Sequence, residues 1–196
     1  MALQVWLPLN GTLENKGLSD INITVTGTTS YTTGKIGNGL NCNGSSYWII
    51  KPVILTNNCS FCFWSKTSDA NAMFFVVNSV TYAFLNFWLY NGKYYLNVGD
   101  SLKNPFQNDG TDVTAHSDNI WHHYTITFDG TQCLLYIDGN YYGKAKTYRN
   151  PTTTSANEIK IAGGFSNGHS YDLVGILNDF RIYDHCLSPK EVHDLA

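Results

Sequence analysis

Charged residues are scarce in this 196-residue chain, where they make up 14% of the sequence; an average soluble protein has about 25%. Lys and Arg number 12 against 15 Asp and Glu, which gives a formal net charge of -3. The basic residues are spread singly along the chain, so we expect no basic patch that could neutralise phosphates. Nucleic acid is therefore excluded as an expected partner. Glu and Met, two good helix formers, are rare too, which argues against a helical protein.

Long apolar runs are also missing. None approaches the roughly 20 residues that a membrane-spanning helix needs. The first residues, MALQVWLPLNGTLEN, lack the charged start and the apolar stretch of a signal peptide. We therefore expect no membrane insertion and no secretory leader in the sequence as given.

Cysteine occurs five times at irregular spacing, and an odd number argues against a framework of disulfides. Cys59 and Cys62 form a C-x-x-C sequence, but they lie in NCSFCFWSK, an apolar and aromatic segment typical of a strand. Their side chains would then face opposite sides of a sheet. We expect reduced, buried thiols rather than a zinc or redox site.

Aromatic residues, at 14%, and 17 glycines are plentiful, and about ten short apolar runs are separated by turn signals. Asn91-Gly92 and Asp138-Gly139 each separate two such runs, and these pairs supply the positive φ of tight hairpin turns. Many short strands predict a two-sheet antiparallel sandwich. The polar stretch 101–119 is predicted to be a long functional loop. Ser188 followed by Pro189 and Glu191 predicts a short C-terminal helix.

Three stretches carry a resemblance to a known family: GKIGNGLNCNGSSYWII (34–50), WHHYTITFDGTQCLLYIDGNYYGKA (121–145) and GILNDFRIYDHCLSPKEVHDL (175–195). They resemble the laminin-G-like domains of the concanavalin-A-like lectin and glucanase superfamily, in its bacterial and phage branch. The resemblance implies an all-β jelly-roll sandwich with one short C-terminal helix, formed by residues 1–196 as a single domain. Trp121 would anchor the core between the sheets.

The opening residues, MALQVWLPLNGTLENKGLSD, look like the first domains of phage structural proteins. This likeness implies a virion or tail-associated protein made in the host cytoplasm, with other virion subunits as partners and homo-oligomers among its assemblies. Unpaired thiols agree with a reducing compartment. The chain would be one domain of a longer virion protein.

The glucanases of this superfamily carry two catalytic carboxylates on one strand in an E-x-D-x-E pattern, and retaining enzymes place them about 5 Å apart. The three glutamates here, at positions 14, 158 and 191, are isolated from one another, and no nucleophile elbow is present. We therefore predict a protein that is not an enzyme.

Glycan sites combine flat aromatic surface with short polar side chains. The candidates are Trp88, Tyr90 and Tyr95 around the Asn91-Gly92 turn, and His169, Tyr171 and Asp172 in the loop before the closing strand. They predict a lectin-like domain that recognises a glycan of a host surface or of mucus. The alternatives are a structural module for virion assembly and a degenerate glycoside hydrolase.

Many relatives hold calcium at the rim of the sandwich. No cofactor is required for the predicted function, but the resemblance points to a calcium site made by Asn10, Asn15, Asp20, Asn178 and Asp179. Asn178 stands where the family has Asp, and calcium needs several hard carboxylate oxygens, so this departure weakens the predicted site.

Overall fold

The computed structural model describes residues 2–55, 58–78, 83–98, 104–108, 110–146, 157–164 and 171–196. His169, one of the predicted glycan-binding residues, lies outside these residues. Within them the chain forms seventeen strands and one helix. Their bounds are β1 Leu3–Leu7, β2 Asn22–Thr26, β3 Tyr31–Thr33, β4 Asn38–Asn43, β5 Tyr47–Val53, β6 Cys59–Thr67, β7 Met73–Asn78, β8 Ala83–Tyr90, β9 Lys93–Val98, β10 Asn104–Pro105, β11 Gln107–Asn108, β12 Thr111–Asp112, β13 Trp121–Phe128, β14 Gln132–Ile137, β15 Asn140–Lys146, β16 Asn157–Ile161, β17 Val174–Tyr183 and α1 Pro189–Leu195.

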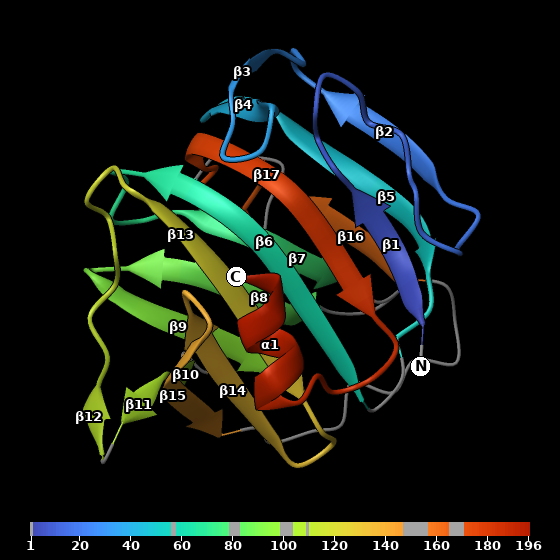
Figure 1. Ribbon diagram of the computed structural model, residues 1–196. Helices are drawn as coiled ribbons and strands as arrows, with labels where there is room; N and C mark the ends of the chain where they lie inside the picture. Colours follow the sequence, from blue (N-terminus) through green and yellow to red (C-terminus); the bar gives the residue numbers. More distant parts are fainter. Residues whose placement is uncertain are drawn as a thin grey trace.

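The strands form two sheets that pack face to face, with α1 on the outer side of the larger one (Figure 1). In the described part of the chain the larger sheet has ten strands in the order β12-β11-β15-β14-β13-β6-β17-β4-β3, with β1 also paired to β17. The smaller sheet has seven, in the order β10-β9-β8-β7-β16-β5-β2. All the strand pairs are antiparallel, for example β13 with β6 and β8 with β9. The predicted two-sheet sandwich is confirmed.

One hydrophobic core fills the space between the sheets. Strand alternation explains its composition, because every second residue of a strand points inward. On β6, Phe61 and Phe63 face the core; Phe61 stacks on Phe75 of the opposite sheet at 4.5 Å between ring centroids. The same alternation places Cys59 in this core and Cys62 in a second cluster outside the sheet, as predicted for the C-x-x-C pair. All five cysteines lie within the described residues and are free thiols.

The expectation for Trp121 was wrong, and part of the predicted long loop is strand. Trp121 is only partly buried, because the odd-numbered residues of β13 point to the outer side of the sheet, away from the core. The tryptophan in the core is Trp48, which is 1% exposed. The stretch 101–119 is not a plain loop. It contains β10, β11 and β12, and Phe106 between them is fully buried in the core.

The C-terminal helix forms as predicted. The Ser188 hydroxyl accepts a hydrogen bond from the Glu191 amide at 3.3 Å, and the Glu191 carboxylate accepts one from the Ser188 amide at 2.8 Å. This capping box satisfies amide groups that the first turn leaves unpaired. It holds the helix so that Val192 packs on Cys62 and Tyr136.

Candidate functional site

The outer face of the seven-stranded sheet carries a row of aromatic side chains. On β8, Leu85, Phe87 and Leu89 point into the core, so the alternate positions Trp88 and Tyr90 point outward. Their rings stack with centroids 5.8 Å apart. The two-residue turn at Asn91-Gly92, with φ of 49° and 70°, brings β9 back beside β8.

That hairpin sets the position of Tyr95, which is paired in register with Trp88. The Tyr95 ring meets the edge of Trp88 at 6.1 Å and that of Tyr90 at 5.9 Å between centroids. These distances lie in the range of favourable edge-to-face aromatic contacts. Three residues that the sequence proposed as a glycan site therefore form one contiguous surface.

Tyr171 joins this surface from a distant part of the chain. Its carbonyl accepts a hydrogen bond from the Met73 amide at 2.7 Å, which docks the segment before β17 against the start of β7. The ring then lies 5.7 Å from Trp88 and 6.1 Å from Tyr90. Tyr171 has a φ of 73°, a conformation uncommon for a tyrosine. Such a constraint fixes where the ring stands.

We refer to Trp88, Tyr90, Tyr95 and Tyr171 as the aromatic cluster. Its members differ in accessibility: Trp88 is 4% exposed and Tyr171 is 37% exposed, with Tyr90 and Tyr95 between them. The buried indole forms the floor, where it packs on Met73 and Val76. The tyrosine rings therefore provide the accessible surface.

Asp172 has a different place from the one predicted. Its carboxylate is 5% exposed and accepts a hydrogen bond from the Gly164 amide at 2.7 Å. The same Gly164 accepts a hydrogen bond from the Lys160 ammonium at 3.1 Å through its carbonyl. Asp172 thus links the chain after β16 to the segment that carries Tyr171. It stabilises the position of that segment and does not contribute to the accessible surface of the cluster.

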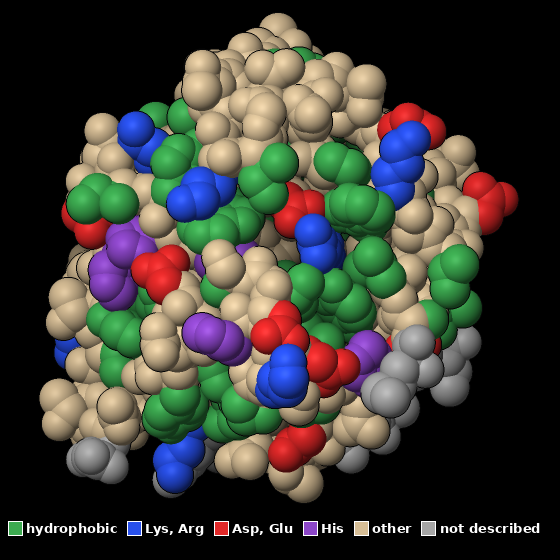
Figure 2. Space-filling model, viewed as in Figure 1, with side chains coloured by type: hydrophobic (Ala, Val, Ile, Leu, Met, Phe, Trp, Pro, Cys, Tyr) green, Lys and Arg blue, Asp and Glu red, His purple; other side chains and the backbone are tan. Residues whose placement is uncertain are grey.

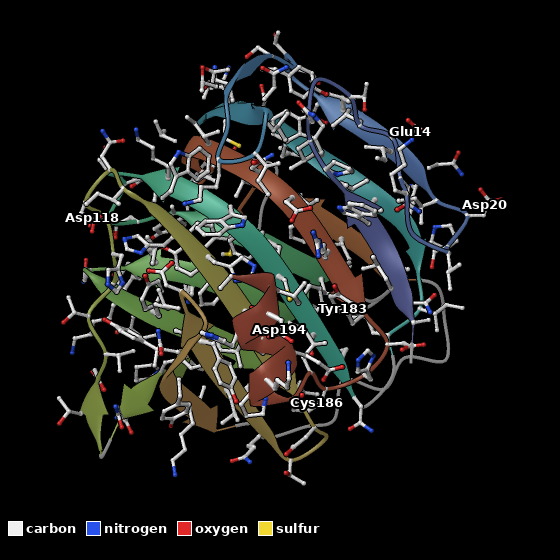
Figure 3. All side chains as sticks on the ribbon, in the orientation of Figure 1. Glu14, Asp20, Asp118, Tyr183, Cys186 and Asp194 are labelled. Carbon is white, nitrogen blue, oxygen red and sulfur yellow. The ribbon has the colours of Figure 1, made fainter. Side chains whose placement is uncertain are left out.

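Of the five residues proposed for calcium, four have side-chain oxygens that already accept hydrogen bonds within the protein. Asp20 is exposed and lies at the outer edge of the molecule, away from β17 in the view of Figure 3. Asn15 accepts hydrogen bonds from the Trp6 and Gly17 amides and donates one to the Ser19 carbonyl. The Asn10 side-chain oxygen, Oδ1, accepts a hydrogen bond from the Asn38 backbone amide at 2.7 Å. These oxygens already hold the opening segment in place.

The side chain of Asn178 forms three hydrogen bonds within the protein. Its side-chain oxygen accepts a hydrogen bond from the Ile36 amide at 2.8 Å, and its amino group donates to the carbonyls of Pro8 and Asn38, each at 2.9 Å. The position explains the pattern. The first half of β17 pairs with β4 and the second half with β1, and Asn178 stands at the change of partner, where the sheet leaves these groups unpaired.

Asp179 is equally occupied. It accepts a hydrogen bond from the Trp6 indole at 2.7 Å and forms a two-point ion pair with Arg181, whose guanidinium also lies over the Trp6 ring. In the described part of the chain, no group of three or more His, Cys, Asp or Glu could hold a metal ion. Calcium binding therefore stays a prediction from the resemblance, at a site where Asn178 and Asp179 already have protein partners.

A pair of histidines that the sequence analysis did not single out, His116 and His122, lies at the start of β13. His122 is held between two carboxylates, with Nδ1 2.7 Å from Asp138 and Nε2 3.3 Å from Asp118. His116 packs on His122 at 4.4 Å between ring centroids. Burial and the neighbouring His122 lower the pKa of His116. His116 belongs to the stretch 101–119, so the pair fixes that stretch to β13.

The three glutamates, all within the described residues, do not pair as a glucanase requires. Glu14 lies in the opening segment and pairs with Lys16 at 2.7 Å, Glu158 on β16 lies 3.8 Å from Lys51, and Glu191 caps α1. Figure 3 shows Glu14 and Asp118 on opposite sides of the molecule. No two glutamates share an element.

Basic side chains are dispersed as the sequence predicted. On the face that Figure 2 shows, Lys and Arg lie apart from one another, and some of them lie beside acidic groups. The Lys190–Asp194 and Arg181–Asp179 pairs are two examples. No helix among the described residues is long and apolar enough to cross a membrane.

Comparison with known proteins agrees with this architecture. Domain 4 of AbnA, a GH43 extracellular arabinanase from Geobacillus stearothermophilus, in complex with arabinotriose, is similar over 100% of this chain and 98% of its own, with a TM-score of 0.78 and 21% identity. The binding domain of Paraclostridial Mosquitocidal Protein 1 has a TM-score of 0.74 and 19% identity over 99% of this chain and 51% of its own. At these identities the likeness shows the fold.

Sequence comparison gives a relative and a family. The Sushi, von Willebrand factor type A, EGF and pentraxin domain-containing protein 1 of Rattus norvegicus is 30% identical over an alignment of 173 residues that covers 76% of this chain and only 4% of that protein. The family described as the concanavalin A-like lectin/glucanases superfamily, in its Laminin_G_3 group, matches residues 42–193. The chain therefore belongs to the Laminin_G_3 family of the concanavalin A-like lectin/glucanases superfamily.

Proposed function

We propose that the aromatic cluster binds a carbohydrate and that this domain recognises glycans without cleaving them. One observation carries the proposal: four aromatic rings from three chain segments meet on the outer face of a sheet, outside the main core. Aromatic surface of this kind binds the apolar face of a sugar ring. The similar domain that holds arabinotriose supports a glycan as the ligand.

The proposal does not include hydrolysis, because the three glutamates already have structural partners. A retaining glycosidase needs a nucleophile and an acid about 5 Å apart. Each glutamate instead serves an ion pair or a helix cap. Reducing-sugar release from glycans that bind would return the degenerate hydrolase to consideration.

The experiment is a glycan array on the purified chain, followed by titration calorimetry with a glycan that binds. Tyr90→Ala removes one accessible ring, and Tyr171→Asn removes another while keeping a residue that tolerates positive φ. Each loses a stacking contact that contributes about 0.5–1.5 kcal/mol, so the affinity should fall about two- to tenfold. If both variants bind the glycan with the affinity of the wild-type chain, the assignment of the site is refuted.

A matched control is available on the other sheet. Tyr141 on β15 is 46% exposed, comparable with Tyr171, and its ring contacts Tyr136 rather than the cluster. Tyr141→Ala should leave the affinity unchanged. If no glycan binds the folded wild-type chain, the structural and assembly role becomes the better proposal.

We also propose that copies of this domain stand on a phage particle, beside other virion subunits, and recognise a glycan of the host surface or of mucus. The phage-like opening residues and the five free thiols support this location. Many copies would raise a weak affinity per site by avidity. Detection of the chain by mass spectrometry in purified particles tests the location, and its absence from them would refute it.

A further inference from the structure

Asn86 lies on the same face as the aromatic cluster. It alternates along β8 with Leu85 and Phe87, which point into the core, and so points outward with Trp88. Its partner in register on β7 is Val76, which packs with Trp88 in the small cluster beneath the tyrosines. Asn86 therefore continues the row of Trp88 and Tyr90 by one position.

The carboxamide of Asn86 lacks hydrogen bonds. The residue is 1% exposed, and neither Oδ1 nor Nδ2 has a partner among the described residues. A buried polar group without a partner costs folding free energy, whereas an apolar residue such as its neighbour Val76 would not. Such a group calls for an explanation, and a ligand that supplies the missing donor and acceptor is one.

The charges of this face indicate which ligand. Lys93 pairs with Asp112 at 2.6 Å, and Lys51 lies 3.8 Å from Glu158. Lys160 donates to the Gly164 carbonyl and lies over the Tyr47 ring, 4.3 Å from its centroid. Each of these cations is already engaged within the protein. An acidic sugar would find no ready counter-charge among them, whereas a neutral one needs none.

We propose that Asn86 is the polar specificity-determining contact of the aromatic cluster and that the ligand is a neutral glycan. The proposal rests on the glycan-binding function proposed above. Rings of the cluster hold the apolar face of a sugar, while the Asn86 carboxamide accepts a hydrogen bond from one hydroxyl and donates one to another. Because Asn86 is buried, the sugar must displace the groups that cover the carboxamide.

The test separates stability from binding. Asn86→Leu removes both polar atoms at similar volume, and Asn86→Val is a second variant that suits a strand. The melting temperature of the free protein should stay the same or rise, because an unpaired polar group has been removed. Affinity for a neutral glycan found on the array should fall about tenfold or more, because two hydrogen bonds are lost.

Ser65→Ala is the matched control. Ser65 on β6 of the other sheet is also 1% exposed, with a hydroxyl that has no partner among the described residues. Its removal should likewise not destabilise the protein, and glycan affinity should stay at the wild-type value.

The outcomes distinguish the two proposals. Loss of binding in Tyr90→Ala with wild-type affinity in both Asn86 variants would overturn the role of Asn86 and leave the glycan site standing. Binding of sialylated glycans alone by the wild-type chain would overturn the neutral ligand. Absence of any glycan binding by the wild-type chain would refute the proposed function and this inference together.

Discussion

The Asn178 side chain stabilises the protein at the point where β17 changes partners, and replacing it should cost more than most single changes. Asn178→Ala removes three hydrogen bonds and leaves the Ile36 amide and the carbonyls of Pro8 and Asn38 without their partner. The residue is fully buried. These hydrogen bonds are partly buried and each contributes about 1 kcal/mol net, so their loss should cost about 3 kcal/mol in total.

For a chain of this length that loss lowers the melting temperature by about 6–12 °C. Urea unfolding followed by tryptophan fluorescence gives the free energy directly. Asn10→Ala is the control, because it removes one exposed hydrogen bond from the same loops and should cost less than about 1 kcal/mol. A loss of under about 1 kcal/mol in Asn178→Ala would refute the reasoning.

Asn178 also allows a test of calcium binding. Asn178→Asp restores the residue that the family carries, but it turns two donated hydrogen bonds into contacts between a carboxylate and carbonyl oxygens. The wild-type melting temperature should not change with calcium or with chelator, since Asn178 is occupied. A rise with calcium in the wild type would show that the predicted site binds after all.

Three further changes follow from the structure. Ser188→Ala breaks the capping box and should lower the melting temperature by about 2–4 °C, for a cost of about 1 kcal/mol, as measured by calorimetry. Burial lowers the pKa of His123 from 6.5 to about 4, so the unfolded chain binds the proton more readily and stability should fall by about 3 kcal/mol as the pH drops from 6.5 to 4. Urea titrations of His123→Gln should show a flatter dependence over that range, and an unchanged slope would contradict the assignment. Cys186 is the least buried thiol and should react with a thiol reagent before the other four cysteines, in a labelling time course read by mass spectrometry.

The elements whose signals are local were predictable. The Asn91-Gly92 hairpin, the capped helix after Ser188 and the opposite orientation of Cys59 and Cys62 each depend on neighbours in sequence. Trp121 was misplaced because the sequence does not show which face of β13 points inward. The pairing of β13 with β6 fixes which residues of β13 point inward, because Tyr124 lies opposite Phe63 and both side chains face the core.

Part of the candidate site was likewise predictable from the sequence, and part of it depends on tertiary contacts. Trp88, Tyr90 and Tyr95 could be grouped from the sequence because one short turn joins their strands. The contact of Tyr171 with them depends on the docking of Tyr171 against Met73, which lies almost a hundred positions away in the chain. Asn86 looks like an ordinary strand residue until the structure shows that its buried carboxamide has no hydrogen-bond partner among the described residues.

The sequence by itself therefore determined the class of fold, the turns, the helix cap and the dispersed charge, because these follow from local conformational preference and composition. Tertiary structure decided which polar groups are already satisfied. Asn178 and Asp179 have the chemistry of cation ligands, yet Asn178 is hydrogen-bonded to the Pro8 carbonyl and Asp179 to the Trp6 indole. Only the packed chain fixes such partners, because they come from segments far apart in sequence.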